Sequence, residues 1–349
     1  MISPKTYRLK RISAAILLAL FLIAEAIPSF AAEIATADPV FAAKPKTIAE
    51  AIAACQELAR KDEKDLTFLG VVLAAGRVLQ PDLDCAVIER QIQEIAGKAK
   101  TAAAKETGAQ AKIAAVNKII YKDYGFRTDM SGAGDNAMFE FEDGLDASLL
   151  HRVLARKQGV CLGLSTVYLV VAEKAQLPVV GIHAPYHIFC RYNAEPDKIN
   201  IECTAQGIAT TDVAERRITG ATEAGMISEQ YFRPITKKQM LSDQLNNLAY
   251  CLGTRKKGPA PLTMAQVGEI ADLAAKLQPK AHEVLDTAGL LQFINGNPVR
   301  ALQICDQAIE LAKEYGGPGP TLPQYEERKK QYEEAIEKSK KAKEPLGKN

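Results

Sequence analysis

The stretch Ser148-Leu-Leu-His-Arg-Val-Leu-Ala-Arg-Lys-Gln-Gly-Val-Cys161-Leu-Gly-Leu-Ser-Thr-Val-Tyr-Leu169 decides the fold of the middle of the chain. It predicts a helix over Leu149–Ala155, a break at Lys157–Gly159 and a strongly apolar helix over Cys161–Ala175. Runs rich in Val, Ile, Phe and Tyr follow, separated by turns that contain proline. They predict strands over Pro178–His183, His187–Tyr192 and Lys198–Cys203. Helices followed at once by short strands predict an α+β core with an antiparallel sheet.

Cys161 stands at the predicted start of the apolar helix, directly after Gly159 and Val160. Backbone N–H groups without partners and the helix macrodipole favour a thiolate at such a place. Arg156 and Lys157 add positive charge just upstream. These features make Cys161 a candidate nucleophile, and the alternative is a buried helix residue without a chemical role.

His187 and Glu202 lie at the outer ends of two strands that a short turn can join. If Tyr192 pairs with Asp197 across a four-residue turn, Asn193–Pro196, then His187 stands directly opposite Glu202. Opposed residues share one face of the sheet and lie within side-chain reach, so the carboxylate can orient the imidazole. A thiol, a base and an orienting acid are the parts of an activated nucleophile. A register shift of one residue would separate them.

A resemblance to a known family rests on the quoted stretch together with Gln176–Ile182 and Pro185–Arg191. These segments resemble the SirB-type transglutaminase-like family, and the similarity extends from about Asp65 to the C-terminal helices. The resemblance implies a papain-like cysteine core followed by tetratricopeptide repeats. It also implies that Cys161 is the nucleophile of that core, that His187 is its histidine, and that Glu202 holds the position usually taken by aspartate.

Other polar residues near this site have simpler explanations. His183 lies four residues before His187, which in an extended chain is roughly 13 Å, so we expect only His187 to serve the site. The same separation argues against a zinc site built from His183, His187 and Cys190, and we expect neither a metal nor a cofactor. Ser165 lies one helical turn after Cys161, where it either lines the pocket or packs the helix.

The segments on either side of the core have helical spacing. Upstream, they predict helices over Thr47–Arg60, Leu66–Leu79, Asp84–Ala99 and about Lys112–Tyr124. Downstream, a helix over Leu241–Leu252 precedes a repeat whose matching residues lie 34 positions apart, which is the tetratricopeptide period. The matching pairs are Ile270 and Ile304, Ala274 and Ala308, and Leu277 and Leu311.

The N-terminus predicts export. Four cationic residues among the first eleven precede an apolar run, Ile12–Ala24, and small residues follow it. This order is typical of a secretory signal peptide, with cleavage after Ala31 and Ala32 as the competing position. An uncleaved anchor is the alternative, but Glu25 leaves the run short of the ~20 residues that a bilayer crossing needs. We therefore expect a periplasmic or secreted protein with no stable membrane span after cleavage.

These observations predict an organisation by segments. It comprises a signal peptide over residues 1–31, a low-complexity linker over 32–46, a helical subdomain over 47–125, a transglutaminase-like core over 126–234, tetratricopeptide-like helices over 235–340 and a disordered tail over 341–349. The seven cysteines are widely and irregularly spaced, so we assign no disulfide.

Two hypotheses about function follow. In the first, Cys161 attacks a carboxamide or peptide carbonyl of a peptide or protein substrate, and water or an amine completes hydrolysis or transfer. In the second, the fold is a non-catalytic scaffold that binds a protein partner through its helical repeats. Lys and Arg number 44 against 42 for Asp and Glu, and this near-balance gives no reason to expect nucleic acid as a partner.

Overall fold

Helix α8 (Cys161–Ala175) is the centre around which the other elements pack. The computed structural model describes residues 44–129, 144–255, 261–315 and 321–343. In that part of the chain, α8 contacts helices α3 (Phe68–Leu79) and α4 (Cys85–Ala103), and it also contacts strands β3 (Val179–Ala184) and β4 (His187–Asn193). Its side chains from Gly163 to Ala172 are all buried. The predicted apolar helix therefore has the predicted bounds, and it is apolar all round because neighbours cover every side.

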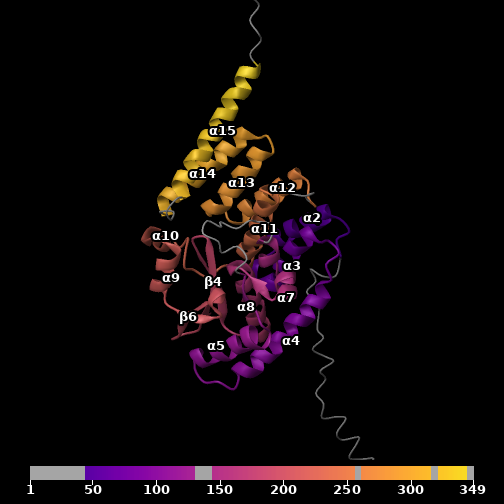
Figure 1. The fold of residues 1–349 in the computed structure, drawn as a ribbon, viewed down its shortest axis with the longest axis vertical. Coiled ribbons are helices and arrows are strands. Elements are labelled where there is room, and N and C mark those ends of the chain that lie inside the picture. The colour runs from indigo at the N-terminus through magenta and orange to yellow at the C-terminus, as the bar shows by residue number, and fades with distance from the viewer. Residues whose placement is uncertain (1–43, 130–143, 256–260, 316–320, 344–349) are drawn as a thin grey trace, which may run out of the picture. The chain divides into compact units, whose positions relative to one another are not determined.

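The sheet has four antiparallel strands in the order β3-β4-β5-β6. Residues Pro185 and Tyr186 form a tight turn between β3 and β4, with Ala184 paired to His187. The remaining strands are β5 (Lys198–Glu202) and β6 (Ile208–Thr210). The mostly helical α+β fold with a small antiparallel sheet is thus confirmed (Figure 1).

Helices precede the sheet, as the sequence predicts. Thr47, Thr67 and Asp84 begin the first three long ones by accepting hydrogen bonds from first-turn N–H groups. The predicted helix over Lys112–Tyr124 is in fact an α-helix that continues as a π-helix, η3. The elements up to β2 that have not yet been given are α2 (Ile48–Arg60), η2 (Glu63–Asp65), α5 (Ala109–Asn117), η3 (Lys118–Asp123), β1 (Arg127–Thr128), α6 (Gly144–Ser148), α7 (Leu150–Arg156) and β2 (Gln158–Gly159).

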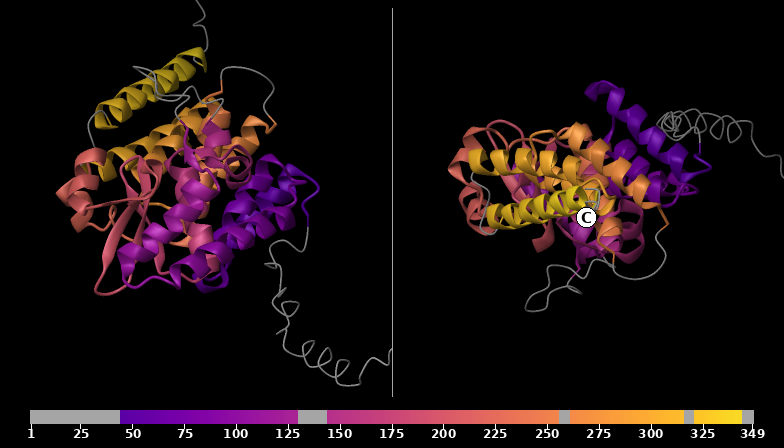
Figure 2. Two further views of the ribbon diagram at one scale, coloured as in Figure 1. Left: turned by 60° about the horizontal axis from the view of Figure 1, so that its bottom comes forward. Right: turned by 90° about the horizontal axis from the view of Figure 1, so that it is seen from above.

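Helices also follow the sheet, and each of the last four contacts the next (Figure 2). Helix α12 begins at Met264 and α14 at Pro298, so the helices keep the 34-residue spacing of the sequence repeat. The elements after β5 are η4 (Cys203–Ala205), α9 (Asp212–Thr219), α10 (Glu223–Ile227), α11 (Lys237–Gly253), α12 (Met264–Leu277), α13 (His282–Ile294), α14 (Pro298–Tyr315) and α15 (Thr321–Lys343).

Some predicted segments lie outside the described residues. These are the signal peptide over 1–31, the linker up to residue 43 and the tail from residue 344. The proposed segment boundaries stay predictions, and the described residues from 44 onward belong to one unit. Among the described helices, none combines the length and the hydropathy needed to cross a bilayer.

Gly163 tests the packing at the start of α8. A Cβ atom there would lie 2.2 Å from the Ala147 carbonyl oxygen and 2.8 Å from Val153 Cγ2. We expect Gly163→Ala to lower the free energy of unfolding by about 2–3 kcal/mol, since the added methyl meets backbone that cannot rotate away. Gly97→Ala on α4 is the matched control, because open space surrounds that position and alanine favours helix. Urea unfolding measures both, and equal stability in the two variants would contradict this packing.

Candidate active site

His187 and Glu202 are in direct contact. His187 begins β4, Glu202 ends β5, and His187 Nε2 lies 2.7 Å from Glu202 Oε2. The other carboxylate oxygen, Oε1, accepts a hydrogen bond of 2.8 Å from the Thr204 backbone N–H. This second bond fixes the carboxylate plane, so Glu202 holds the imidazole in one orientation.

The hairpin that carries this pair has a different turn from the predicted one. Asn193 pairs with Lys198, so the turn comprises Ala194–Asp197 and not Asn193–Pro196. Asn193 stays within β4 because its N–H donates to the carbonyl of Pro178, the residue just before β3, at 2.7 Å. Pairing beside β3 therefore extends β4 to Asn193, a contact that does not follow from the β4 and β5 sequences alone.

His187 and Glu202 remain in contact because the observed register differs from the predicted one by two residues, an even number. Cys190 pairs with Ile201, so continuing the ladder puts Glu202 across from Phe189, two residues from His187. The predicted direct opposition of His187 and Glu202 is thus wrong. Side chains alternate between faces along a strand, so both residues still share one face and meet as a diagonal pair.

Cys161 is the first residue of α8, and close backbone packing sets its position. The Val160 N–H donates to the Ala147 carbonyl at 2.9 Å, and both Gly159 and Gly163 leave room for that carbonyl where a Cβ atom would crowd it. Cys161 lies near enough to His187 to raise the pKa of its imidazole, and both side chains line the same cleft. The structure thus brings the three predicted residues together, with His187 between the thiol and the carboxylate.

The cationic residues upstream of Cys161 have other partners. Arg156 pairs with Asp129 at 3.1 Å, and its second nitrogen lies 3.8 Å from Asp146. The Lys157 ammonium lies 4.5 Å from the centre of the Phe126 ring, where cation–π attraction holds it. We expected Arg156 and Lys157 to favour a Cys161 thiolate, but their charged groups contact Asp129, Asp146 and Phe126.

His187 has an unusual electrostatic environment. Burial alone would lower the pKa of its imidazole, but hydrogen bonds with Cys161 and Glu202 and their negative charges raise that pKa to about 10. For Glu202, burial would raise the pKa, but the His187 contact outweighs it and lowers the pKa of the carboxyl. Both shifts favour an imidazolium–carboxylate pair at neutral pH.

A second carboxylate, Glu215 on α9, lies beside this pair. Sequence reasoning missed it, because an exposed-looking helix with two arginines after the glutamate gives no sign of burial. Glu215 is fully buried, its Oε1 accepts a hydrogen bond from Thr210, and its pKa is raised because of burial. Ligand atoms of His187, Glu202 and Glu215 lie within 4.8 Å of one another, a spacing that could hold a metal ion. In this structure, His187 Nε2 and Glu202 Oε2 are hydrogen-bonded to each other.

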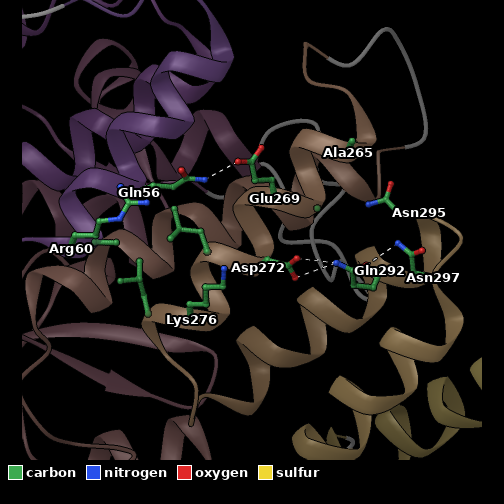
Figure 3. Close-up of a pocket in the computed structure, with 13 residues that line it drawn as sticks. Gln56, Arg60, Ala265, Glu269, Asp272, Lys276, Gln292, Asn295 and Asn297 are labelled. Atoms are coloured by element: carbon green, nitrogen blue, oxygen red, sulfur yellow. Dashed lines mark hydrogen bonds between the residues drawn. The ribbon is translucent and has the colours of Figure 1, made fainter.

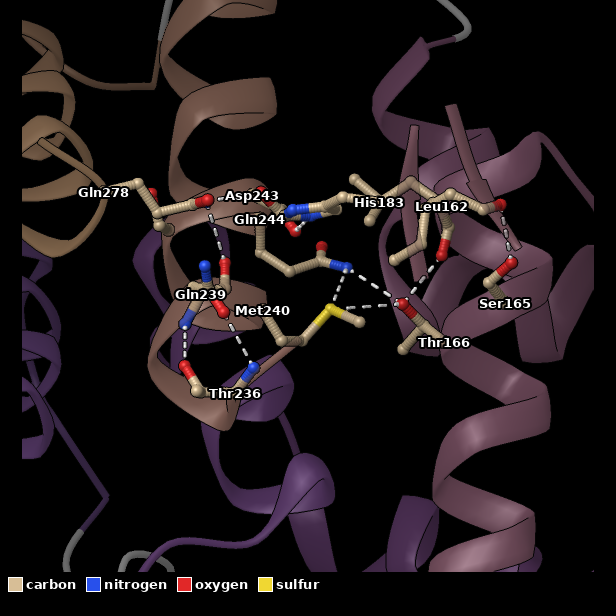
Figure 4. A network of polar contacts seen from close by, with 12 residues as sticks. Leu162, Ser165, Thr166, His183, Thr236, Gln239, Met240, Asp243, Gln244 and Gln278 are labelled. Carbon is tan, nitrogen blue, oxygen red and sulfur yellow. Dashed lines mark hydrogen bonds and ion pairs between the residues drawn. The ribbon is translucent and has the colours of Figure 1, made fainter. Parts of the chain in front are cut away.

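His183 is closer to the site than predicted. The extended-chain separation from His187 does not apply, because the Pro185–Tyr186 turn places the two histidines on neighbouring antiparallel strands. Figure 4 shows His183 beside Asp243 of α11, with 2.6 Å between Nε2 and Oδ2. Asp243 also accepts a hydrogen bond of 2.6 Å from Gln278. Burial would lower the pKa of His183, but Asp243 and, more weakly, Glu283 raise it.

A cleft of about 450 Å³ opens beside Cys161, within the size range of small-ligand sites. His183 and His187 both line it. Its walls come from the β3–β4 turn and from α11, α13 and α15, so helices far along the chain complete a site that begins at α8. Ser165, by contrast, is buried and donates to the Ile188 carbonyl at 3.0 Å, so it packs the helix against the sheet.

A second cavity, of about 830 Å³, lies between α2 and the α12–α13 pair (Figure 3). Its lining is polar: Gln56 donates to Glu269 at 2.8 Å, and Gln292 donates to Asp272 at 3.0 Å. None of the predicted site residues lines it. This cavity has the surface of a polar binding groove without the chemistry of the Cys161 cleft.

Comparison with known proteins agrees with this geometry. Residues 86–246 match the transglutaminase-like superfamily, and this range contains Cys161, His187 and Glu202. The chain carries a transglutaminase-like domain. The narrower SirB-type assignment stays a prediction.

Relatives and one solved structure extend the likeness beyond that range. A UPF0162 protein of Xylella fastidiosa strain Temecula1 is 24% identical over 73% of this chain and 87% of its own length. A UPF0162 protein of strain 9a5c is also 24% identical, over 67% and 79%. The crystal structure of menin matches with a TM-score of 0.52 at 14% identity, covering 84% of this chain and 68% of menin. The fold is therefore menin-like.

The protonation of His187 can be measured by NMR. The unfolded imidazole has a pKa of about 6.5, so a folded value near 10 contributes stability that is complete below pH 6.5 and is lost as the pH rises through 10. We expect the His187 ring signals to titrate far above pH 7. Glu202→Gln should lower this pKa because the paired negative charge is gone, and exposed Glu310→Gln is the control.

Buried His151, whose pKa burial lowers to about 4, provides an internal reference in the same spectra. A His187 that titrates near 6.5 in the wild type would contradict the contacts described here.

Proposed function

We propose that the chain is a cysteine-dependent acyl-transfer or hydrolytic enzyme that acts on a peptide or carboxamide carbonyl. The observation that carries this proposal is the His187–Glu202 contact at 2.7 Å beside Cys161, in the lining of one cleft. The transglutaminase-like domain supports it, because that architecture is built around such a cysteine site.

The chemical step follows from the geometry. Cys161 Sγ attacks the carbonyl carbon, and His187, having taken the thiol proton, donates a proton to the leaving amine as the thioester forms. Water or an acceptor amine then loses a proton to His187 and attacks the thioester, which releases the product and restores the thiol. Glu202 orients and stabilises the imidazolium throughout. Backbone N–H groups at the start of α8 would bind the oxyanion, since Val160 places no side-chain cap on them.

A second candidate function is a scaffold that binds a protein partner through the helical repeats. The observation in its favour is the menin-like fold, since the menin crystal structure was described as revealing a binding site for the Mixed Lineage Leukemia protein. The polar cavity between α2 and the α12–α13 pair would suit such a partner. This function needs no reactive thiol at Cys161.

We further propose that the protein works in the cell envelope or outside the cell. The signal-peptide pattern before Ala31 supports this location. On expression with its own N-terminus in a bacterial host, we expect the mature chain to begin at Ala32, or at Glu33 if cleavage follows Ala32. Intact-mass measurement of the extracted protein identifies the cleavage site. A chain that retains its first 31 residues would count against export.

Alkylation kinetics test the enzymatic proposal. All seven cysteines are described, and Cys161 is the one among them that is not buried, so iodoacetamide should label it selectively in the folded protein. We expect the reaction at pH 6.5 to be about tenfold slower in His187→Ala, because thiolate and not thiol is the nucleophile. Mass spectrometry of the peptide that carries Cys161 gives the rate.

His282→Ala is the control histidine variant, since His282 is buried against Tyr231 and Tyr325 and is not among the residues that line the cleft beside Cys161. Equal alkylation rates at Cys161 in the wild type and in His187→Ala would contradict activation of the thiol by His187. The scaffold function would then be favoured.

A further inference from the structure

The cleft beside Cys161 contains more negative than positive side chains beyond the Cys161–His187–Glu202 group. Three carboxylates line it there, those of Asp243, Glu283 and Asp286, together with two side chains that can be cationic, His183 and Arg328. Burial raises the pKa of Asp286 to about 6, which is still below pH 8. The lining therefore contains one more carboxylate than it contains side chains that can be cationic.

The contacts identify which carboxylate is in excess. His183 pairs with Asp243 at 2.6 Å, and Arg328 pairs with Asp286. Each of these ion pairs is close to neutral in sum. Glu283 forms no ion pair with a lysine, an arginine or His183 among the residues that the structure describes, although its charge acts on His183 together with that of Asp243.

The partners that Glu283 does have are neutral. Its Oε1 accepts a hydrogen bond of 2.9 Å from the Tyr231 hydroxyl. His282 Nδ1 lies 3.5 Å from Oε2, but burial lowers the pKa of that imidazole, so it carries no charge at pH 8. The Glu283 side chain is only 19% exposed. A carboxylate so far removed from water gains from a cation that enters the cleft.

Other groups of the lining favour a ligand that is rich in donors. Asn246 Oδ1 is buried and accepts no hydrogen bond from any described residue. Tyr186 is 61% exposed on the turn between β3 and β4, although its hydroxyl is already bonded to Thr321 at 3.1 Å. An accessible aromatic ring, an unpaired amide oxygen and an uncompensated carboxylate are the features that bind ammonium and guanidinium groups.

We propose that Glu283 binds the cationic side chain of a lysine- or arginine-bearing peptide substrate while Cys161 attacks its carbonyl. This inference rests on the proposed function for the choice of reaction. The binding step itself needs only that a ligand joined to Cys161 extends along the cleft toward α13.

Three alkylating probes of equal length test the proposal on the full-length protein at pH 8. Each is an iodoacetamide whose tail ends in an ammonium, in the acetylated amine or in a carboxylate. Each rate at Cys161 is divided by its rate with the same protein unfolded in urea, which removes the intrinsic reactivity of the probe. We expect the ammonium probe to react about tenfold faster than the acetylated one, and the carboxylate probe to react slowest.

Glu283→Gln keeps an acceptor for Tyr231 and removes the charge, so the ammonium preference should fall to about twofold or less. Glu310→Gln removes an exposed charge on α14 and should preserve the preference. Should Glu283→Gln unfold, the wild-type comparison decides alone, supported by a loss of preference in 1 M salt. Equal rates for the three tails in the wild type overturn the proposal.

Plain iodoacetamide separates this failure from that of the proposed function. A rate at Cys161 that depends on His187, combined with no preference among tails, overturns the cation site and leaves the enzymatic proposal standing. A rate that is independent of His187, combined with a clear ammonium preference, overturns the enzymatic proposal and supports the cation site.

Discussion

The close approach of the start of α8 to the Ala147 carbonyl is the constraint on which the site depends. That oxygen accepts the Val160 N–H at 2.9 Å, and it leaves no space for a side chain at Gly163. The next residue, Ser148, accepts a hydrogen bond of 2.6 Å from Asn247 of α11. One short segment therefore fixes both the helix that presents Cys161 and the helix that forms a wall of the cleft.

The cleft combines two imidazole–carboxylate pairs from neighbouring strands. His187 meets Glu202 within the sheet, whereas His183 reaches out of it to Asp243 on α11. In each pair the carboxylate raises the pKa of the histidine against the effect of burial. The two pairs differ in their surroundings, because the Cys161 thiol acts on the pKa of His187, whereas the causes of the His183 shift include no thiol. Under the proposed function, this difference assigns proton transfer to His187 and leaves the His183 pair as part of the cleft wall.

Local pattern was sufficient to predict much of the fold and part of the site. The bounds of α8 and the starts of β4 and β5 follow from apolar runs and proline-containing turns, which act within a few residues. The shared face of His187 and Glu202 follows from strand alternation, which an even shift in register preserves. The sequence could not predict contacts that depend on distant partners. Examples are the burial of Glu215 on α9 and the Arg156–Asp129 ion pair, which draws a charge away from Cys161.

The way α8 packs on the sheet explains why the histidine of the site is the first residue of its strand. Cys190 Sγ lies 3.7 Å from the Ser165 carbonyl, so α8 covers the face that carries Cys190. His187 is three residues earlier, and alternation points it to the opposite face, where it stacks with Phe189. A side chain on that face deeper in the strand would have the sheet between it and the helix. At the end of the strand, the Cys161 thiol can approach an imidazole on the far face of the sheet. Under the proposed function, the chemistry therefore takes place at the rim where the cleft opens.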